Sequence, residues 1–119
     1  MKPLTVDSNE SELNQLLKKR HNVALEELIA RHSEFFEGRG TVEFLYDAAI
    51  HLRKSRLELA RDKAERLVVM QDHLAWTTVI EEITRGRHEA GTVATKIYRE
   101  ASYRRMQAEI DLLRLVDSK

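Results

Sequence analysis

Apolar residues recur three and four positions apart along four segments of this chain, which is the spacing of one face of an amphipathic α-helix. The first segment begins after Ser11, a residue type that caps helix N-termini, and it ends near two glycines, Gly38 and Gly40. The second segment begins after Thr41, which is another N-cap residue type. These signals predict one helical hairpin in the first half of the chain, with its turn at the two glycines.

The second half of the chain repeats this arrangement of signals. Asp62 and Glu65 form a D-x-x-E capping pattern, which predicts a helix start in mid-chain. That helix is expected to end at Gly86 or Gly91, and Thr92 is the expected N-cap of a fourth helix. The apolar positions expected to form the buried stripes of the four helices are, in chain order, Leu13, Leu16, Leu17, Val23, Ala24, Leu28, Ile29, Phe44, Leu45, Ala48, Ala49, Leu52, Leu59, Leu67, Val68, Leu74, Ala75, Val79, Ile80, Ile83, Ile97, Ala101, Ala108, Leu112 and Leu115.

Aligned with itself at an offset of 51 residues, the chain matches at several kinds of position at once. The tripeptide Gly-Thr-Val at residues 40–42 lies on the same tripeptide at residues 91–93, and Ser11 lies on Asp62. Agreement of turns, caps and apolar stripes at one offset favours duplication of a helix–turn–helix unit. The sequence therefore predicts that the glycines at 40 and 91 occupy equivalent places in two related hairpins.

The predicted architecture is all-α: two tandem antiparallel helical hairpins, residues 11–61 and 62–116, that form a four-helix bundle. Residues 1–10 are polar and are expected to be a disordered N-terminal segment ahead of the helical domain, residues 11–119. One alternative stays open, because residues 57–66 contain neither Gly nor Pro. In that alternative, helices two and three are fused into one rod roughly 65–70 Å long, and the protein is a dimer because a second copy covers its apolar stripe.

The composition is typical of a helical protein and limits the classes of partner that we expect. Apolar residues make up 42% of the 119 residues and charged residues 34%, with 4 Gly, 1 Pro and no Cys, so disulfide and thiolate chemistry are excluded. Twenty basic residues balance twenty acidic ones, and no nucleic-acid partner is expected because phosphate binding favours a basic excess. No run approaches the ~20 apolar residues of a membrane span. No signal peptide is recognised at the N-terminus, so the expected location is cytoplasmic.

The five histidines are the first candidates for metal chemistry. In di-iron helical bundles a ligating His follows a Glu by three positions, and no histidine of this chain does so. Asp47 and His51 lie one helical turn apart, and His21 and His32 share a helix face. A surface or partly buried structural role is favoured for both pairs. No metal-ligating or cofactor-binding residue is therefore assigned.

Motifs for nucleophilic catalysis and phosphate binding are also missing. Ser33 adjoins His32, but neighbouring residues on a helix point to different faces. Residues 86–91 have the glycine spacing of a P-loop without the Lys-Ser/Thr that this motif requires. The basic residues Arg85 and Arg87 suit the C-terminal end of a helix, where positive charge offsets the helix dipole. No catalytic residue is predicted, and the chain is expected not to be an enzyme.

Residues 87–93 (Arg-His-Glu-Ala-Gly-Thr-Val), followed by Ala101, the Ala-Glu pair at 108–109 and the Leu-Leu pair at 112–113, resemble the helical hairpin of TolC-type outer-membrane efflux proteins. In that family an Arg-Tyr-x-x-Gly-x-x-Ser/Thr turn precedes a helix with spaced alanines, and the helical unit is duplicated. This chain has His88 in place of that Tyr and Ala94 in place of the Ser or Thr, and no barrel strands or signal peptide are recognised. The resemblance implies a helical hairpin used as a small module, and it carries over no functional residue.

The last helix carries the feature that bears most on function. Between Met106 and Val116 its apolar residues cover more than a 100° stripe, so one neighbouring helix is not enough to bury them. We therefore expect a non-catalytic interaction or scaffold module whose partner is a second copy of the chain or another helical protein. The alternative is a helical bundle that binds a small ligand or a metal with His and Asp or Glu side chains between its helices.

Overall fold

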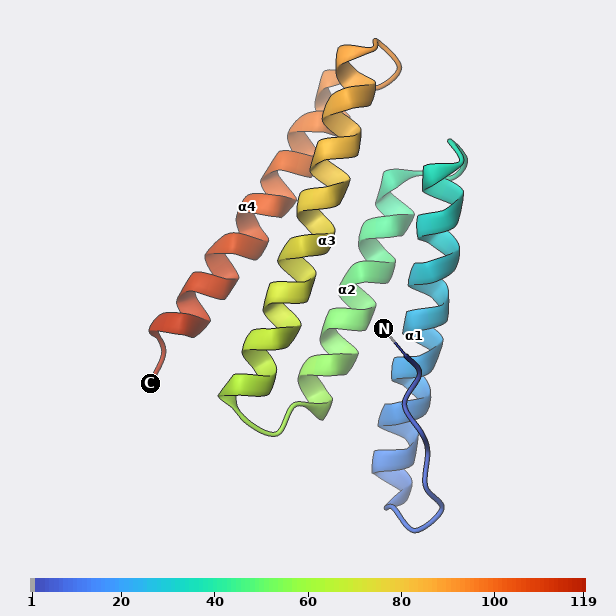
Figure 1. Cartoon of the computed structure of the whole chain (residues 1–119), viewed down its shortest axis with the longest axis vertical. Coiled ribbons are helices and arrows are strands. Elements are labelled where there is room, and N and C mark those ends of the chain that lie inside the picture. The colour runs from blue at the N-terminus through green and yellow to red at the C-terminus, as the bar shows by residue number, and fades with distance from the viewer. Residues whose placement is uncertain (1) are drawn as a thin grey trace. The chain divides into compact units, whose positions relative to one another are not determined.

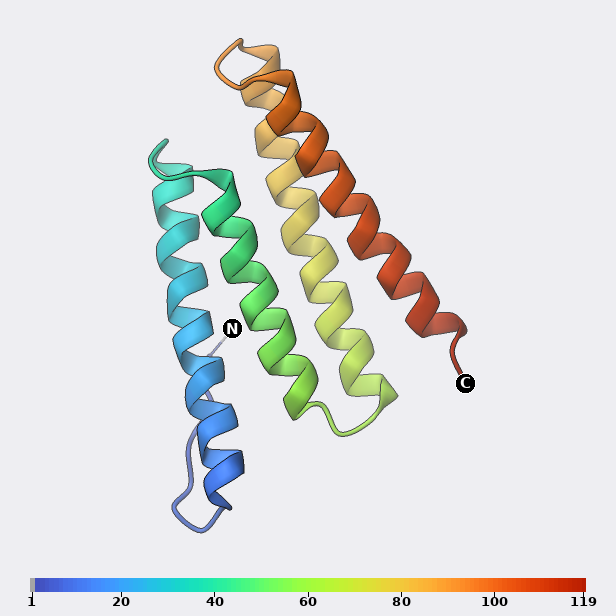
Figure 2. The same cartoon turned by 180° about the vertical axis from the view of Figure 1, so that it is seen from behind.

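The computed structural model describes residues 2–119, and this part of the chain is all-α, without strands (Figure 1). The helices are α1 (Glu12–Phe36), α2 (Val42–Leu59), α3 (Lys63–Glu89) and α4 (Thr95–Asp117). Both views show α1 antiparallel to α2 and α3 antiparallel to α4 (Figures 1 and 2). The predicted fold class, with two tandem helical hairpins, is confirmed. The chain divides into two compact units after Arg66, within the first turn of α3.

Side-chain caps fix the starts of the first three helices. The Ser11 hydroxyl accepts a hydrogen bond from the Asn14 backbone N–H at 3.1 Å, and the Thr41 hydroxyl accepts an equivalent bond at 3.4 Å. The Asp62 carboxylate accepts from the Glu65 backbone N–H at 2.9 Å. These three predicted caps are confirmed, because each oxygen satisfies a donor that the first helical turn leaves without a helical acceptor.

Between α2 and α3 the chain leaves the helical conformation. Ala60, the C-cap of α2, has φ −68° and ψ 130°, which is extended backbone. The Glu65 carboxylate accepts from the Arg61 backbone N–H at 2.6 Å and is paired with the Arg61 guanidinium at 2.8 Å. Together with the Asp62 cap, these bonds stabilise a new helix start. The alternative prediction of one fused rod is wrong, because a rod requires continuous helix through these residues.

The turns of the two hairpins have the same local structure. Gly38 (φ +79°) and Gly91 (φ +78°) each follow a helix C-terminus in the left-handed conformation that glycine tolerates best. Both turns contain the paired N–H···O=C bonds of a Schellman motif, which satisfy carbonyl groups of the last helical turn. These bonds measure 2.8–3.1 Å and join Gly38 to Phe35, Arg39 to Glu34, Gly91 to His88 and Thr92 to Arg87.

The place of Gly91 in its turn corrects two sequence predictions. Gly91 corresponds to Gly38 and not to Gly40, so the hairpins match at an offset of 53 residues at their turns. The difference from 51 arises because α3 has 27 residues and α1 has 25. Thr92 does not cap α4, since its hydroxyl donates to a carbonyl of the last turn of α3 at 2.9 Å, and the N-cap is Ala94. Duplication of the hairpin stays a prediction.

The buried side chains of hairpin one centre on Leu28 of α1 and Leu45 of α2, which are 1% and 0% exposed. Several residues predicted for the buried stripes are exposed instead: Leu13, Leu16, Val23, Ile29, Phe44, Val68, Ala75 and Val79. The first two lie beyond the end of α2, because α1 is seven residues longer and Arg20 already pairs with Glu58 in the last turn of α2. The helical spacing predicts an apolar stripe on each helix. It does not determine which part of that stripe is covered by a shorter neighbouring helix.

Residues 2–10, for which the sequence predicts a disordered segment, form no helix but are bonded to α1. The Leu4 backbone N–H donates to the Asn22 side-chain carbonyl at 2.8 Å, and the Asn22 amide donates back to the Leu4 carbonyl at 2.9 Å. Lys18 forms an ion pair with Glu10 and donates to the Thr5 carbonyl at 3.3 Å. These contacts place the segment along the N-terminal half of α1.

Candidate functional site

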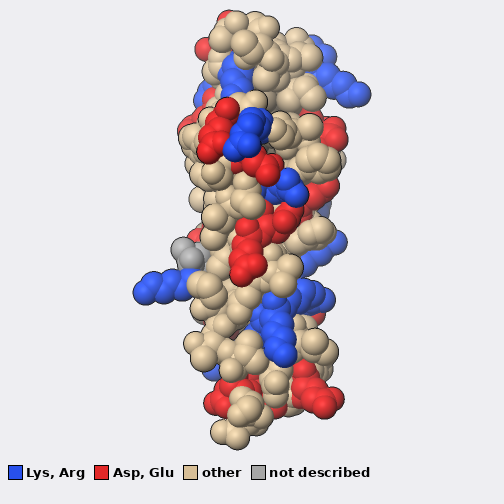
Figure 3. Space-filling model, turned by 90° about the vertical axis from the view of Figure 1, so that its right-hand side faces the viewer, with Lys and Arg blue, Asp and Glu red and all other residues tan. Residues whose placement is uncertain are grey.

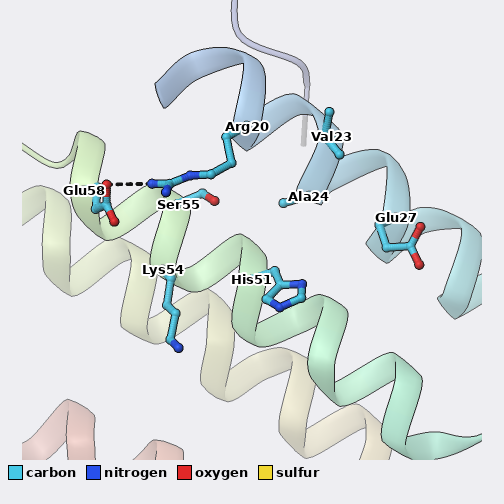
Figure 4. Close-up of a pocket in the computed structure, with 8 residues that line it drawn as sticks. All are labelled: Arg20, Val23, Ala24, Glu27, His51, Lys54, Ser55 and Glu58. Carbon is cyan, nitrogen blue, oxygen red and sulfur yellow. Dashed lines mark hydrogen bonds and ion pairs between the residues drawn. The ribbon is translucent and has the colours of Figure 1, made fainter. Parts of the chain in front are cut away.

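A groove of about 540 Å³ lies between α1 and α2 within hairpin one (Figure 4). Its walls come from four residues of each helix: Arg20, Val23, Ala24 and Glu27 of α1, and His51, Lys54, Ser55 and Glu58 of α2. Its volume falls within the range of small-molecule sites, ~300–1,000 Å³. The groove is therefore the first place to look for a ligand site in this hairpin.

Arginine side chains engage both carboxylates of the groove. Arg20 Nη2 lies 2.6 Å from Glu58 Oε2, and each of these side chains is 53% exposed (Figure 4). Glu27 is paired with Arg31 Nε at 2.7 Å, and Arg31 is also paired with Glu34 at 2.9 Å. Hydrogen bonds from Arg31 to Glu27 and then to Glu34 raise the pKa of its guanidinium. The acidic groups of the groove are thus compensated within the chain.

Six of the eight residues that line the groove are polar or charged by type. Typical ligand pockets are lined mainly by apolar side chains with a few convergent polar groups. Here only Val23 and Ala24 are apolar, and His51 and Lys54 are exposed to solvent. Within residues 2–119 no three His, Asp or Glu side chains lie together as a set of metal ligands. The predicted pair of Asp47 and His51 thus has no third ligand in the described chain.

Three of the other histidines, His21, His32 and His88, make local contacts within their own hairpins. His21 is buried, with Nδ1 3.0 Å from the Asn22 side-chain oxygen, and the His32 ring meets the Phe36 ring edge-on at 4.5 Å between centroids. His88 Nε2 lies 3.0 Å from the Thr95 hydroxyl, and its ring stacks on that of Tyr98 at 5.3 Å. The last pair of contacts joins the end of α3 to the start of α4. His88 therefore helps to close the turn of hairpin two.

Gly86 and two arginines of hairpin two have structural roles in the described chain. Gly86 lies inside α3, so residues 86–91 are not a phosphate-binding loop. Arg104 is paired with Glu100 at 3.1 Å, and Arg105 is paired with Glu81 at 3.1 Å. Figure 3 views the molecule from the α1 side of Figure 1, and basic and acidic side chains are interspersed on that face of hairpin one as well. No helix in the described chain combines the length and the apolar composition needed to cross a membrane.

An exposed apolar seam runs along α4 and is the second candidate site. We use the name α4 seam for Tyr103, Met106, Ile110 and Leu113, whose exposed fractions are 65%, 48%, 43% and 56%. Their spacing of three, four and three residues is that of the a and d positions of a heptad, which place side chains along one face of a helix. Val116, 51% exposed, adjoins this face. A contiguous row of large apolar side chains in solvent is typical of an interaction surface.

The opposite face of α4 is the one buried in hairpin two. Ala101 and Ala108 lie there, seven residues apart, with exposed fractions of 0% and 2%. Small side chains at this spacing let α4 approach its neighbour closely. The Arg105 side chain reaches across to Glu81 of α3 and holds α4 in this rotation. The α4 seam therefore faces away from α3 as a consequence of how the hairpin packs.

Comparison of the chain with protein-family models, with curated proteins and with solved structures finds no match. The two candidate sites thus rest on the geometry of the chain alone. Sequence reasoning anticipated excess apolar surface on the last helix, although it did not single out Tyr103. The groove was missed, because Val23 was expected in the core and nothing in the sequence pairs Arg20 with Glu58. The a/d spacing was the signal available for the α4 seam.

Proposed function

We propose that this chain is a non-catalytic helical module that associates with a second copy of itself through the α4 seam. The observation that carries the proposal is the exposure of four large apolar side chains at a/d spacing on one helix face. Helices recognise one another through such rows, because knobs-into-holes packing buries them together. The groove in hairpin one, whose walls include the ion pair of Arg20 with Glu58, gives less support to a ligand-binding role.

The energy available is that of a weak and reversible association. Full burial of a large apolar side chain contributes about 1.5–3 kcal/mol, so a half-exposed one contributes about 0.8–1.5 kcal/mol when a partner covers it. Eight such side chains in a dimer contribute about 6–12 kcal/mol. The lost translational and rotational freedom costs about 4–15 kcal/mol. The expected Kd is therefore micromolar or weaker.

Matched glutamate substitutions test this proposal. Ile110→Glu places a charge in the middle of the α4 seam and is expected to abolish self-association in sedimentation velocity at high protein concentration. Ile29→Glu makes the same chemical change at a residue of α1 that is 56% exposed and lies outside the seam. It is expected to leave association unchanged. Circular dichroism of both variants checks that the helices are retained.

Two results would contradict the proposal. If Ile110→Glu associates as strongly as the wild type, the α4 seam is not the interface. If both variants lose association equally while remaining helical, the self-association depends on general surface apolarity and not on this seam. Saturable binding of another helical protein by a wild-type chain that stays monomeric would replace the second copy with a different partner.

A further inference from the structure

We infer that the two copies pair their α4 helices antiparallel, with Tyr103 of one copy against Leu113 of the other and Met106 against Ile110. This inference rests on the proposed function and specifies how the α4 seam is used. In an antiparallel helix pair, each a residue shares a layer with a d residue of its partner. Both pairings are centred on the same level of the helix, that of Ala108, so one two-fold axis generates all four apolar layers.

Charge at the two ends of the α4 seam supports this register. Arg99 lies four residues before Tyr103, and Asp117 lies four residues after Leu113, so both continue the a/d series. The same two-fold axis brings Arg99 of each copy opposite Asp117 of the other. Both side chains are exposed in the chain. The apolar layers are thus closed at each end by one pair of opposite charges, which selects this register over shifted ones.

The residues that flank the α4 seam fit the same arrangement. Glu100 of each copy comes beside Arg114 of the other, which adds two pairs of opposite charge. Glu100 already lies 3.1 Å from Arg104 in its own chain, so its carboxylate is held at this surface. The one unfavourable neighbour is Glu109, which approaches its own symmetry mate near the axis. Arg105 donates to Glu109 at 2.7 Å and offsets that like charge.

A parallel pair of α4 helices matches charge less well. It sets Arg99 against Arg99 of the second copy and Asp117 against Asp117, so both terminal layers bring like charges together. It also stacks Tyr103 on Tyr103 at one level. The one favourable charge contact beside the apolar layers of the parallel pair joins Glu109 of one copy to Arg114 of the other. The antiparallel arrangement has four pairs of opposite charge, which outweigh the contact of Glu109 with Arg114 in the parallel one. The α4 seam is therefore covered by a second copy in antiparallel orientation.

Cross-linking of single-cysteine variants tests the orientation directly, because the chain has no cysteine of its own. Tyr103→Cys and Leu113→Cys are each treated with a short bismaleimide, alone and as an equimolar mixture. The antiparallel register predicts at least a fivefold higher yield of covalent dimer in the mixture. In each variant alone the two thiols lie ten residues apart along the pair, about 15 Å, and react poorly.

The outcomes separate this inference from the proposed function. Self-linking of Tyr103→Cys alone, with no gain in the mixture, overturns the antiparallel orientation and leaves self-association standing. Equal yields in all three reactions overturn any fixed register. A wild-type chain that sediments as a monomer at every concentration overturns the proposed function itself, and the inference with it.

Charge reversal gives an independent readout that leaves the apolar layers intact. Arg99→Asp is expected to raise the dimer Kd at least threefold, because it sets two aspartates opposite each other at both ends of the pair. Adding Asp117→Arg in the same chain is expected to restore the wild-type Kd. In a parallel pair Arg99→Asp replaces the contact of two arginines with a contact of two aspartates, so the repulsion in that layer and the dimer Kd stay about the same. An unchanged Kd for Arg99→Asp therefore overturns the inference.

Discussion

Arg105 of α4 and Glu81 of α3 form an ion pair across hairpin two, with 3.1 Å between Nε and Oε1. The Glu81 side chain is only 14% exposed, so this contact lies at the edge of the helix packing. The hydrogen bond to Glu81, followed by that to Glu109, raises the pKa of Arg105. Because it joins the two helices, this pair stabilises, together with the buried Ala101 and Ala108, the rotation of α4 that turns the α4 seam away from α3.

Removal of this pair is expected to loosen hairpin two. Arg105→Ala leaves the largely buried Glu81 carboxylate without its cross-helix partner, so the thermal midpoint of unfolding should fall. Arg104→Ala is the matched control, because Arg104 is paired with Glu100 on the same helix. Differential scanning calorimetry compares the two variants. A midpoint as low for Arg104→Ala as for Arg105→Ala would mean that the cross-helix pair has no special role.

The buried alanines of α4 set how closely the helix can pack. Ala101 is 0% exposed, so Ala101→Leu forces a larger side chain into a closed contact. We expect it to reduce the free energy of unfolding by about 1–3 kcal/mol. Ala75→Leu, at an exposed alanine of α3, should change it by less than about 0.5 kcal/mol. Urea unfolding measures both, and equal effects would contradict close packing at Ala101.

The N-cap at Asp62 is one of the contacts that stabilise the start of α3. Asp62→Ala removes the acceptor for the Glu65 N–H and is expected to cost about 1 kcal/mol of stability. Asp62→Asn keeps a capping oxygen and should cost much less. Chemical denaturation followed by circular dichroism distinguishes them. A similar cost for both substitutions would point to the charge of Asp62, and not to its capping bond, as the stabilising feature.

The Glu65 carboxylate should make stability depend on pH in the acid range. Hydrogen bonds from the Arg61 side chain and then from its backbone N–H hold the pKa of Glu65 below its ordinary value of 4.5. The unfolded chain therefore binds a proton at Glu65 at a higher pH than the folded chain does. The stabilising contribution is complete above the unfolded-state pKa and is lost as pH falls through the lower folded-state pKa.

Glu65→Gln separates the contribution of the Glu65 carboxylate to the pH dependence of stability from those of the other carboxylates. At pH 7 the variant is expected to be less stable than the wild type, and the difference should shrink as the pH falls below about 4.5. Thermal unfolding at a series of pH values measures the difference. A difference that stays constant down to the lowest pH at which the protein folds would show that the carboxylate charge does not contribute.

The helices and most of their starts follow from local chemistry that the sequence displays. Ser11, Thr41 and Asp62 are capping residues immediately before amphipathic segments, and the bonds they accept are made within three residues. Such contacts depend little on distant parts of the chain. Thr92 shows where this reasoning fails, because its hydroxyl bonds back to α3 and leaves the cap position to Ala94.

The features of the candidate sites depend on which helix covers which edge of its neighbour. Val23 has the helical spacing of a core residue, yet it is 65% exposed because it lies at the edge of the α1 stripe, in the wall of the groove. The contact between Arg20 and Glu58 joins residues 38 positions apart, and no local signal specifies it. In the same way, the sequence indicates excess apolar surface on α4, while the packing that buries Ala101 and Ala108 determines which side chains of α4 are exposed.

Sedimentation equilibrium of the wild-type chain is the most direct test of self-association through α4. Over protein concentrations from about 5 μM to about 500 μM, a Kd in the micromolar range or weaker should raise the average mass from that of the monomer toward that of a dimer. The monomer has a mass of 13.9 kDa. A reversible rise that fits a monomer–dimer equilibrium is the predicted result. A mass that stays at 13.9 kDa over the whole range would contradict the account.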